Sequence, residues 1–214
     1  MSYGGSYFRT RFVFDAKRDR VWKEICRFLQ ERYVPAQSKI LDIGAGYCEF
    51  INNIHGREKH ALDTYGKMPE YAGRDVITHV QSSTAMDTFE DGLFDTVFSS
   101  NLFEHLTREE LSRTLREIRR VLRGGGKLIV IQPNFKYCYM EYFDDYTHLQ
   151  VFTHIALCDL LETYGFGIVY VEPRFVPFSM KANLPKFPLL IRLYLRSRIR
   201  PLAGQMLIVA EKEE

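Results

Sequence analysis

The sequence predicts an α/β fold: a doubly wound, Rossmann-like sheet of seven mostly parallel strands, with an antiparallel last strand. Short apolar segments typical of strands alternate with amphipathic helical segments along the 214 residues. One apolar strand, at residues 40–43, runs into a glycine-bearing turn, as strands do where such a sheet binds a ligand. We expect a single domain over residues 1–214, with an N-terminal helical segment at about 1–36 and a basic, apolar insertion at about 174–204.

Helical segments separate the expected strands. Residues 15–33 carry apolar side chains at helical spacing, and Pro35 ends that pattern. A capping box at residues 107–110 opens a second helix, which the three glycines at 124–126 end. A third helix is expected over residues 153–164.

The expected strands are short, rich in β-branched and aromatic residues, and bounded by turn residues. Their alternation with helices implies parallel pairing through right-handed crossovers, so helices should cover both faces of the sheet. The segments concerned are residues 40–43, 59–62, 76–80, 95–100, 127–132, 168–171 and 205–210.

Composition excludes several classes of protein. The formal net charge of +2 gives no general signal for a nucleic-acid partner, and we expect none. The first residues lack a long apolar run, which argues against a signal peptide or a membrane-spanning helix there. The four cysteines include no Cys-x-x-Cys pair, so neither a zinc site nor a disulfide framework is expected, and the cytoplasm is the expected compartment.

The turn after the first strand indicates a cationic ligand. A dinucleotide site reads Gly-x-Gly-x-x-Gly and presents a helix N-terminus to a pyrophosphate. Here Glu49 stands where the third glycine of that pattern belongs, and Asp42 lies beside the turn, so two acids would face the phosphates. S-adenosylmethionine, which carries an ammonium and a sulfonium, suits the same geometry better.

The turn resembles motif I of the class I S-adenosylmethionine-dependent methyltransferases, whose pattern is Asp-x-Gly-x-Gly-x-Gly. Asp42, Gly44 and Gly46 match, and Cys48 replaces the last glycine. Other segments that match the family in the right order are Asp63 about 20 residues beyond the turn, residues 99–106 after the fourth strand, and the glycine-rich residues 122–128.

The resemblance implies S-adenosylmethionine as cofactor and assigns its contacts. The turn would meet the methionine portion, Asp63 the ribose hydroxyls, and the loop at 81–86 the adenine, where relatives often carry an acid and this chain has serines. The cofactor-binding residues expected on this basis are Asp42, Gly44, Ala45, Gly46, Asp63, Ser83 and Asn101.

Structural interpretations of the same residues remain open. Asp63 could be a solvated residue at a strand end, and Glu104 with His105 could begin a helix. His105 recurs at this position in many relatives, so we interpret it as site architecture and not as a base. Asn101 is followed by Leu102 and Phe103, whereas adenine-amino methyltransferases carry an Asn/Asp-Pro-Pro-aromatic motif, which counts against methylation of nucleic-acid bases.

The segment after the fifth strand, residues 132–149, is the candidate acceptor site, because loops at the carboxyl ends of strands line the ligand crevice. We predict His148 as the general base, oriented by Asp144 or Asp145. The alternative is that this acidic stretch only caps the helix at Thr153. A metal held by the same residues is not expected, because the chain offers no convincing further ligand.

The insertion combines cationic and apolar side chains. Such a segment can lie in a membrane interface or bind a phosphate-bearing acceptor, and peripheral membrane contact through residues 181–200 is one expectation. The alternative is a lid helix that packs on the sheet and extends its arginines into water. The cationic residues are Lys181, Lys186, Arg192, Arg196, Arg198 and Arg200.

Together these features predict methyl transfer to a small or lipid-linked glycan acceptor, with a sugar hydroxyl as the nucleophile. Chains with this loop and insertion resemble bacterial methyltransferases that accompany glycan and lipopolysaccharide biosynthesis. One alternative is an O- or N-methyltransferase of a free aromatic metabolite. The other is a partner protein that binds S-adenosylmethionine without catalysis.

Overall fold

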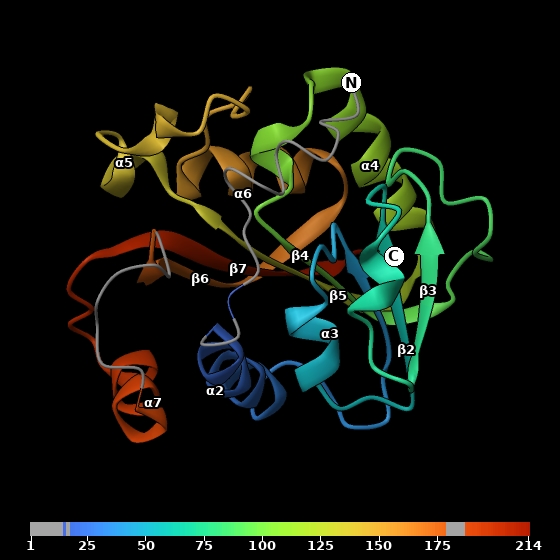
Figure 1. Ribbon diagram of the computed structural model, residues 1–214. Coiled ribbons are helices and arrows are strands. Elements are labelled where there is room, and N and C mark those ends of the chain that lie inside the picture. The colour runs from blue at the N-terminus through green and yellow to red at the C-terminus, as the bar shows by residue number, and fades with distance from the viewer. Residues whose placement is uncertain (1–14, 16–17, 179–186) are drawn as a thin grey trace.

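A single seven-stranded sheet forms the centre of the molecule (Figure 1). The computed structural model describes residues 15, 18–178 and 187–214. The strand order is β3-β2-β1-β4-β5-β7-β6, and β7 pairs antiparallel with both of its neighbours while the other pairs are parallel. The predicted fold class is therefore confirmed. The strands are β1 (Lys39–Ile43), β2 (Glu58–Asp63), β3 (Val76–Val80), β4 (Phe94–Ser100), β5 (Leu122–Pro133), β6 (Phe166–Pro177) and β7 (Ala203–Lys212).

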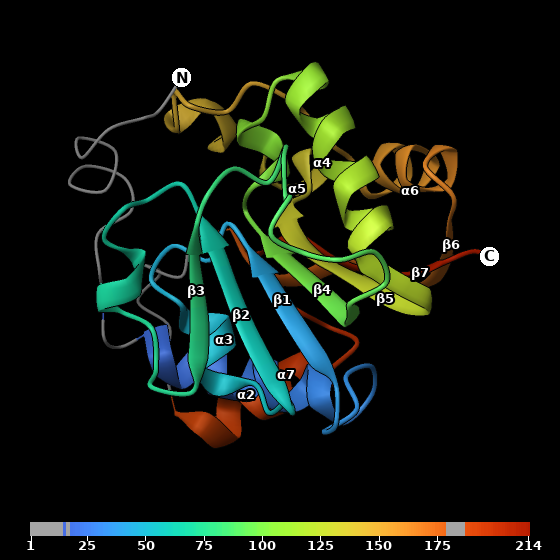
Figure 2. The same cartoon turned by 90° about the vertical axis from the view of Figure 1, so that its right-hand side faces the viewer.

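The order of the strands reverses beside β1. The chain passes from β1 to β2 and β3 on one side, then returns to form β4 on the other side of β1 (Figure 2). Ile43 at the end of β1 lies level with Leu62 of β2 and Ser99 of β4. The carboxyl ends of β1 and β4 therefore form the topological switch point, where open α/β sheets bind their ligands.

Helices cover both faces of the sheet, as their amphipathic patterns predict. On one face lie α2 (Arg18–Gln30), α3 (Glu49–Asn53) and α7 (Pro188–Arg196), and on the other α4 (Arg108–Val121) and α6 (His154–Thr163). Successive side chains of β5 point to opposite faces of the sheet. Leu128 and Val130 pack toward α4 and α6, whereas Ile129 and Ile131 pack toward α2 and α3.

Two element boundaries differ from the sequence prediction. Helix α4 ends at Val121, and the glycines at 124–126 lie inside β5 instead of ending the helix. Leu122 already pairs with Phe94 of β4, so the chain changes to extended backbone before it reaches the glycines. Strand β6 also continues to Pro177, which shortens the expected insertion at its beginning.

The insertion packs against the N-terminal helix. On α7, Arg192 binds Glu24 of α2, and Arg196 binds Glu31, which directly follows α2. Arg200, which follows α7, binds Glu172 of β6. These three cations of the predicted basic segment are therefore paired within the fold. Lys181 and Lys186 lie outside the described residues.

Within the described part of the chain, no helix has the length and apolarity that crossing a bilayer requires.

Candidate cofactor and acceptor site

The glycine turn after β1 has the backbone that the motif requires. Gly44 and Gly46 adopt positive φ angles of 71° and 52°, which side chains disfavour. The N–H groups of Gly44 and Ala45 donate to the Leu62 carbonyl at 2.8 and 3.1 Å, which fixes the turn to the end of β2. A Cβ atom on Gly44 would lie 3.2 Å from the Leu102 side chain, so the segment after β4 approaches the turn closely.

Cys48 adopts the conformation that the missing third glycine would supply. Its φ of 58° is left-handed, and it forms the N-cap of the short helix α3. This conformation costs a non-glycine residue on the order of 1 kcal/mol. Burial, followed by the charge of Asp42, raises the pKa of its thiol to about 12, so Cys48 packs as a neutral apolar group.

Asp63 ties the turn to β2. Its Oδ2 accepts a hydrogen bond from the Gly46 N–H at 2.8 Å, and its Oδ1 accepts one from the Tyr65 N–H at 2.8 Å. Burial raises its pKa, and these backbone donors oppose that rise. A carboxylate has about four acceptor positions, so Asp63 can hold the turn and still accept from ribose hydroxyls.

Asp42 lies buried below the turn, 3% exposed. Burial raises its pKa well above the ordinary value, and the nearby Asp63 carboxylate raises it further. A cation bound beside these two acids would relieve their mutual repulsion and favour the ionised form of Asp42. The turn therefore fits S-adenosylmethionine in both backbone shape and charge.

The other predicted cofactor residues have partners within the protein. The Ser83 hydroxyl is buried and shares a hydrogen bond with Thr114 of α4 at 2.9 Å, so its contact with adenine stays a prediction. Asn101, at a φ of 51°, follows β4, and its side-chain amide donates to the Ser100 hydroxyl at 3.0 Å. Its neighbour Leu102 is the residue that approaches Gly44.

The predicted acceptor loop folds back onto the segment that follows β4. It contains α5 (Phe135–Cys138) and the 3-10 helix η3 (Tyr142–Asp144), and it returns to the 3-10 helix η2 (Phe103–His105). The backbone N–H groups of Leu149 and Gln150 donate to the Glu104 carbonyl at 2.8 and 3.1 Å. These bonds bring His148 beside His105, with ring centroids 4.9 Å apart.

A backbone carbonyl, not a carboxylate, meets Nδ1 of His148. This nitrogen lies 2.7 Å from the Tyr142 carbonyl oxygen and therefore carries the proton, which leaves a lone pair on Nε2. The prediction that Asp144 or Asp145 orients this ring is thus corrected at Nδ1. Asp144 is exposed on the surface of the loop.

Asp145 acts on His105 through a threonine. Its Oδ1 accepts from the backbone N–H and the hydroxyl of Thr147, at 3.0 and 2.6 Å. The same hydroxyl lies 3.0 Å from Nδ1 of His105, and the Thr147 carbonyl lies 3.3 Å from it. Because a carbonyl only accepts, Nδ1 of His105 is protonated and its Nε2 also carries a lone pair.

Glu104 is the site residue that the sequence reasoning missed. Its side chain is 1% exposed, and neither carboxyl oxygen accepts a hydrogen bond from another of the described residues. Burial raises its pKa to about 8; the backbone N–H of Glu104 itself opposes this rise, and the charge of Asp145 adds to it. The available signal was an acid directly before a histidine, just beyond a strand end at the expected ligand crevice. One donor atom from each of Glu104, His105 and His148 lies within 4.8 Å of the others.

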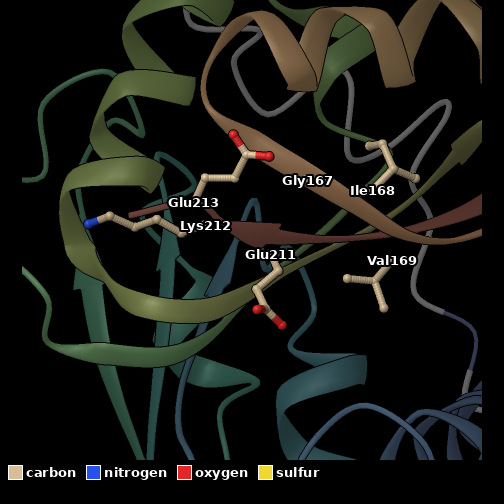
Figure 3. A pocket seen from close by; sticks show the side chains of 6 residues that line it. All are labelled: Gly167, Ile168, Val169, Glu211, Lys212 and Glu213. Atoms are coloured by element: carbon tan, nitrogen blue, oxygen red, sulfur yellow. The ribbon is translucent and has the colours of Figure 1, made fainter.

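A hollow at the opposite edge of the sheet is a different feature. It measures about 290 Å³ and lies where β6 begins and β7 ends (Figure 3). The Glu211 and Glu213 side chains at this hollow point apart, and Lys212 donates to the Leu122 carbonyl at 2.7 Å. Since ligands of open α/β sheets bind at the carboxyl ends of the parallel strands, this hollow is not the candidate site.

Comparison with known proteins agrees with this geometry. Residues 41–130 match the family model described as a methyltransferase domain. An uncharacterized protein of Methanocaldococcus jannaschii is 32% identical over 170 residues, which cover 77% of this chain and 71% of that protein. The sarcosine/dimethylglycine N-methyltransferase of Halorhodospira halochloris is 33% identical over 113 residues, 48% of this chain and 40% of the relative.

Solved structures show the same fold. A chain from the complex between the Haloferax volcanii Trm112 methyltransferase activator and a protein described as a putative methyltransferase superposes with a TM-score of 0.68 at 16% identity. The match covers 92% of this chain and 91% of that chain. The matched segments span only 40% to 65% of the length of several curated relatives. Family membership implies S-adenosylmethionine as the cofactor, in agreement with the charge and shape of the glycine turn. The chain belongs to the class I S-adenosylmethionine-dependent methyltransferases.

Proposed function

We propose that this chain transfers a methyl group from S-adenosylmethionine to a small or lipid-linked glycan acceptor, with a sugar hydroxyl as the reacting group. The observation that carries the proposal is the position of His148, which the returning loop places next to the segment that touches the glycine turn. Curated relatives named for sarcosine, dimethylglycine and demethylmenaquinone support an acceptor of small-molecule type.

The cofactor, when bound, supplies the electrophilic methyl group. Asp42 and Asp63 bind its cationic and ribose portions, and the glycine turn lets the backbone approach it. Transfer from a sulfonium is an in-line displacement, so alignment of the acceptor is the main task of the protein. The Nε2 lone pair of His148 accepts the proton of the hydroxyl, a contribution of roughly 100-fold to 10,000-fold.

The aromatic side chains of the acceptor loop favour a sugar over a free aromatic metabolite. Tyr139, Phe143 and Tyr146 are each 61% to 65% exposed. A metabolite pocket would enclose such rings, whereas exposed flat faces suit the apolar face of a sugar ring that stays partly in water. The closed pocket on which the aromatic-metabolite alternative depends is therefore not supported by these side chains.

Exposed apolar side chains on α7 support a lipid-linked acceptor at the cytoplasmic face of a membrane. Four of them, at 48% to 64% exposure, lie at the start and along one side of the helix. Because Arg192 and Arg196 are paired with Glu24 and Glu31, we expect membrane contact to depend on apolar insertion more than on charge. The side chains are Phe187, Leu189, Leu190 and Leu193.

The test is a transfer assay with labelled S-adenosylmethionine on free sugars, polyprenyl-linked glycans and phenols. We expect labelled product with a glycan and a loss of turnover of at least roughly 100-fold in His148→Ala. Turnover should be unchanged in Asp144→Asn, which removes an exposed acid of the same loop. Unchanged turnover in His148→Ala would rule out the base.

If only phenols become labelled, the acceptor is a free aromatic metabolite and not a glycan. If no acceptor becomes labelled, the result favours a protein that binds S-adenosylmethionine without catalysis. Vesicle co-sedimentation in the same preparations tests the lipid part of the proposal. We expect Leu189→Asp to lower binding, and binding that disappears with added salt would contradict an apolar contact.

A further inference from the structure

We propose that Glu104, His105 and His148 form a binding site for a divalent transition-metal ion of the zinc class. The three residues supply two imidazoles and one carboxylate, with donor atoms within 4.8 Å of one another. The inference is independent of the proposed function, because metal binding can be measured without turnover.

Both histidines are in the tautomer that a metal ligand needs. Nδ1 of His148 donates to the Tyr142 carbonyl, and Nδ1 of His105 donates to Thr147. Each ring therefore carries its lone pair on Nε2. Histidines that bind metals nearly always donate their other ring N–H to a carbonyl, carboxylate or similar acceptor, which fixes the ring and the tautomer.

The outer contacts of His105 extend to a carboxylate. Thr147, which accepts from His105, donates its hydroxyl to Asp145 at 2.6 Å. Thr147 is completely buried, so the arrangement is shielded from water. Partners of this kind orient metal ligands and make them more basic.

Glu104 gives the independent observation that points to a ligand. Its carboxyl group is buried, and neither oxygen accepts a hydrogen bond from another of the residues described. A buried polar group without a partner is costly, and metal coordination is one of the ways in which proteins compensate that cost.

The donor set selects the class of metal. Imidazole nitrogens suit zinc, iron, nickel and copper, whereas magnesium and calcium prefer oxygen ligands only. Two histidines and one glutamate are also a ligand set of zinc sites that keep one position open. Zinc lies about 2.0–2.2 Å from such donors, so binding requires the three donor atoms to move from within 4.8 Å of one another to separations of roughly 3.4 Å.

The sequence did not reveal this site. Glu104 and His105 follow β4, and His148 follows them by more than 40 positions, beyond any short ligand motif. The returning loop brings the three together. A bound ion would occupy Nε2 of His148, the same atom that accepts the proton in the proposed methyl transfer. The site can therefore hold the metal or use His148 as a base, but not both at once.

The experiment titrates the chelator-treated full chain with Zn²⁺ alone, in competition with a chromogenic chelator. We expect one equivalent to bind, and Mg²⁺ in excess not to displace it. Glu104→Gln and His148→Gln should each weaken binding by at least roughly 10-fold, and Asp144→Asn should bind as the wild type does.

Binding of S-adenosylhomocysteine by each variant shows that it is folded, and His105→Gln replaces Glu104→Gln if the latter fails to fold. No zinc binding, binding that survives both ligand substitutions, or displacement by Mg²⁺ would overturn the inference. Zinc binding without methyl transfer would support the metal site and refute the proposed function. Methyl transfer without zinc binding would support the proposed function and refute the metal site.

Discussion

Single residues at the switch point combine conformations and charges that are unfavourable for a ligand-free protein. Cys48 and Asn101 adopt left-handed backbone angles. The acids Asp42 and Glu104 are buried, Asp63 is half-buried, and all three have raised pKa values. Such features persist where the surrounding structure imposes them, and they concentrate at functional sites. Their gathering at the ends of β1, β2 and β4 is consistent with a binding site there.

Asp42 lowers the stability of the ligand-free chain as pH rises. Its pKa is raised in the folded protein, so the folded state retains a proton that the unfolded chain has released above pH 3.8. Stability is thus highest below this unfolded value and falls as pH rises toward the folded pKa. We expect Asp42→Asn to unfold at higher denaturant concentration than the wild type at pH 8, and the difference to shrink on acidification.

The same substitution should weaken binding of S-adenosylmethionine by roughly 10-fold to 100-fold, because a hydrogen bond to a charged group is lost. Urea denaturation across pH and calorimetric titration measure the two effects. A variant that loses stability at every pH, or keeps wild-type affinity, would contradict the role of this carboxyl group.

At the scale of elements, local signals in the sequence predicted more than contacts between distant segments. The capping box at Thr107 and Glu110 starts α4 as expected, because both partners lie within one helical turn. The pairing of α7 with α2 joins residues 168 positions apart, and no local pattern identifies Glu24 as the partner of Arg192. The predicted end of α4 was wrong, because the helix ends where Leu122 pairs with β4 and not at the glycines.

The contact between α2 and α7 depends on a buried acid. Glu24 is 6% exposed and binds Arg192 through both guanidinium hydrogen bonds, at 3.0 and 3.2 Å. We expect Arg192→Ala to lower the free energy of unfolding by about 1–2 kcal/mol, since Arg192 is partly exposed and Arg27 still pairs with Glu24.

The matched control is Arg113→Ala, which removes a pair whose two side chains are 58% and 76% exposed. That change should cost less than about 0.5 kcal/mol. Urea denaturation of both variants makes the comparison, and equal losses would mean that the contact between the helices contributes nothing beyond a surface ion pair.

At the scale of the whole molecule, the order of the strands decides where chemistry can occur. The reversal beside β1 brings the glycine turn, Asp63 and the segment after β4 together at one edge. The motif and the alternation of elements predicted this assembly, because each part follows a strand end. The contact of residues 149–150 with Glu104 was not predicted, because it depends on the return of a loop that the sequence does not specify.

The central claim is that this edge binds S-adenosylmethionine through the turn and Asp63, independently of the residues that act on the acceptor. Calorimetric titration with S-adenosylhomocysteine tests it most directly. We predict one site per chain in the wild type, loss of at least roughly 10-fold in affinity in Asp63→Ala, and unchanged affinity in His148→Ala. Wild-type affinity in a folded Asp63→Ala chain, or no binding by the wild type, would contradict the account.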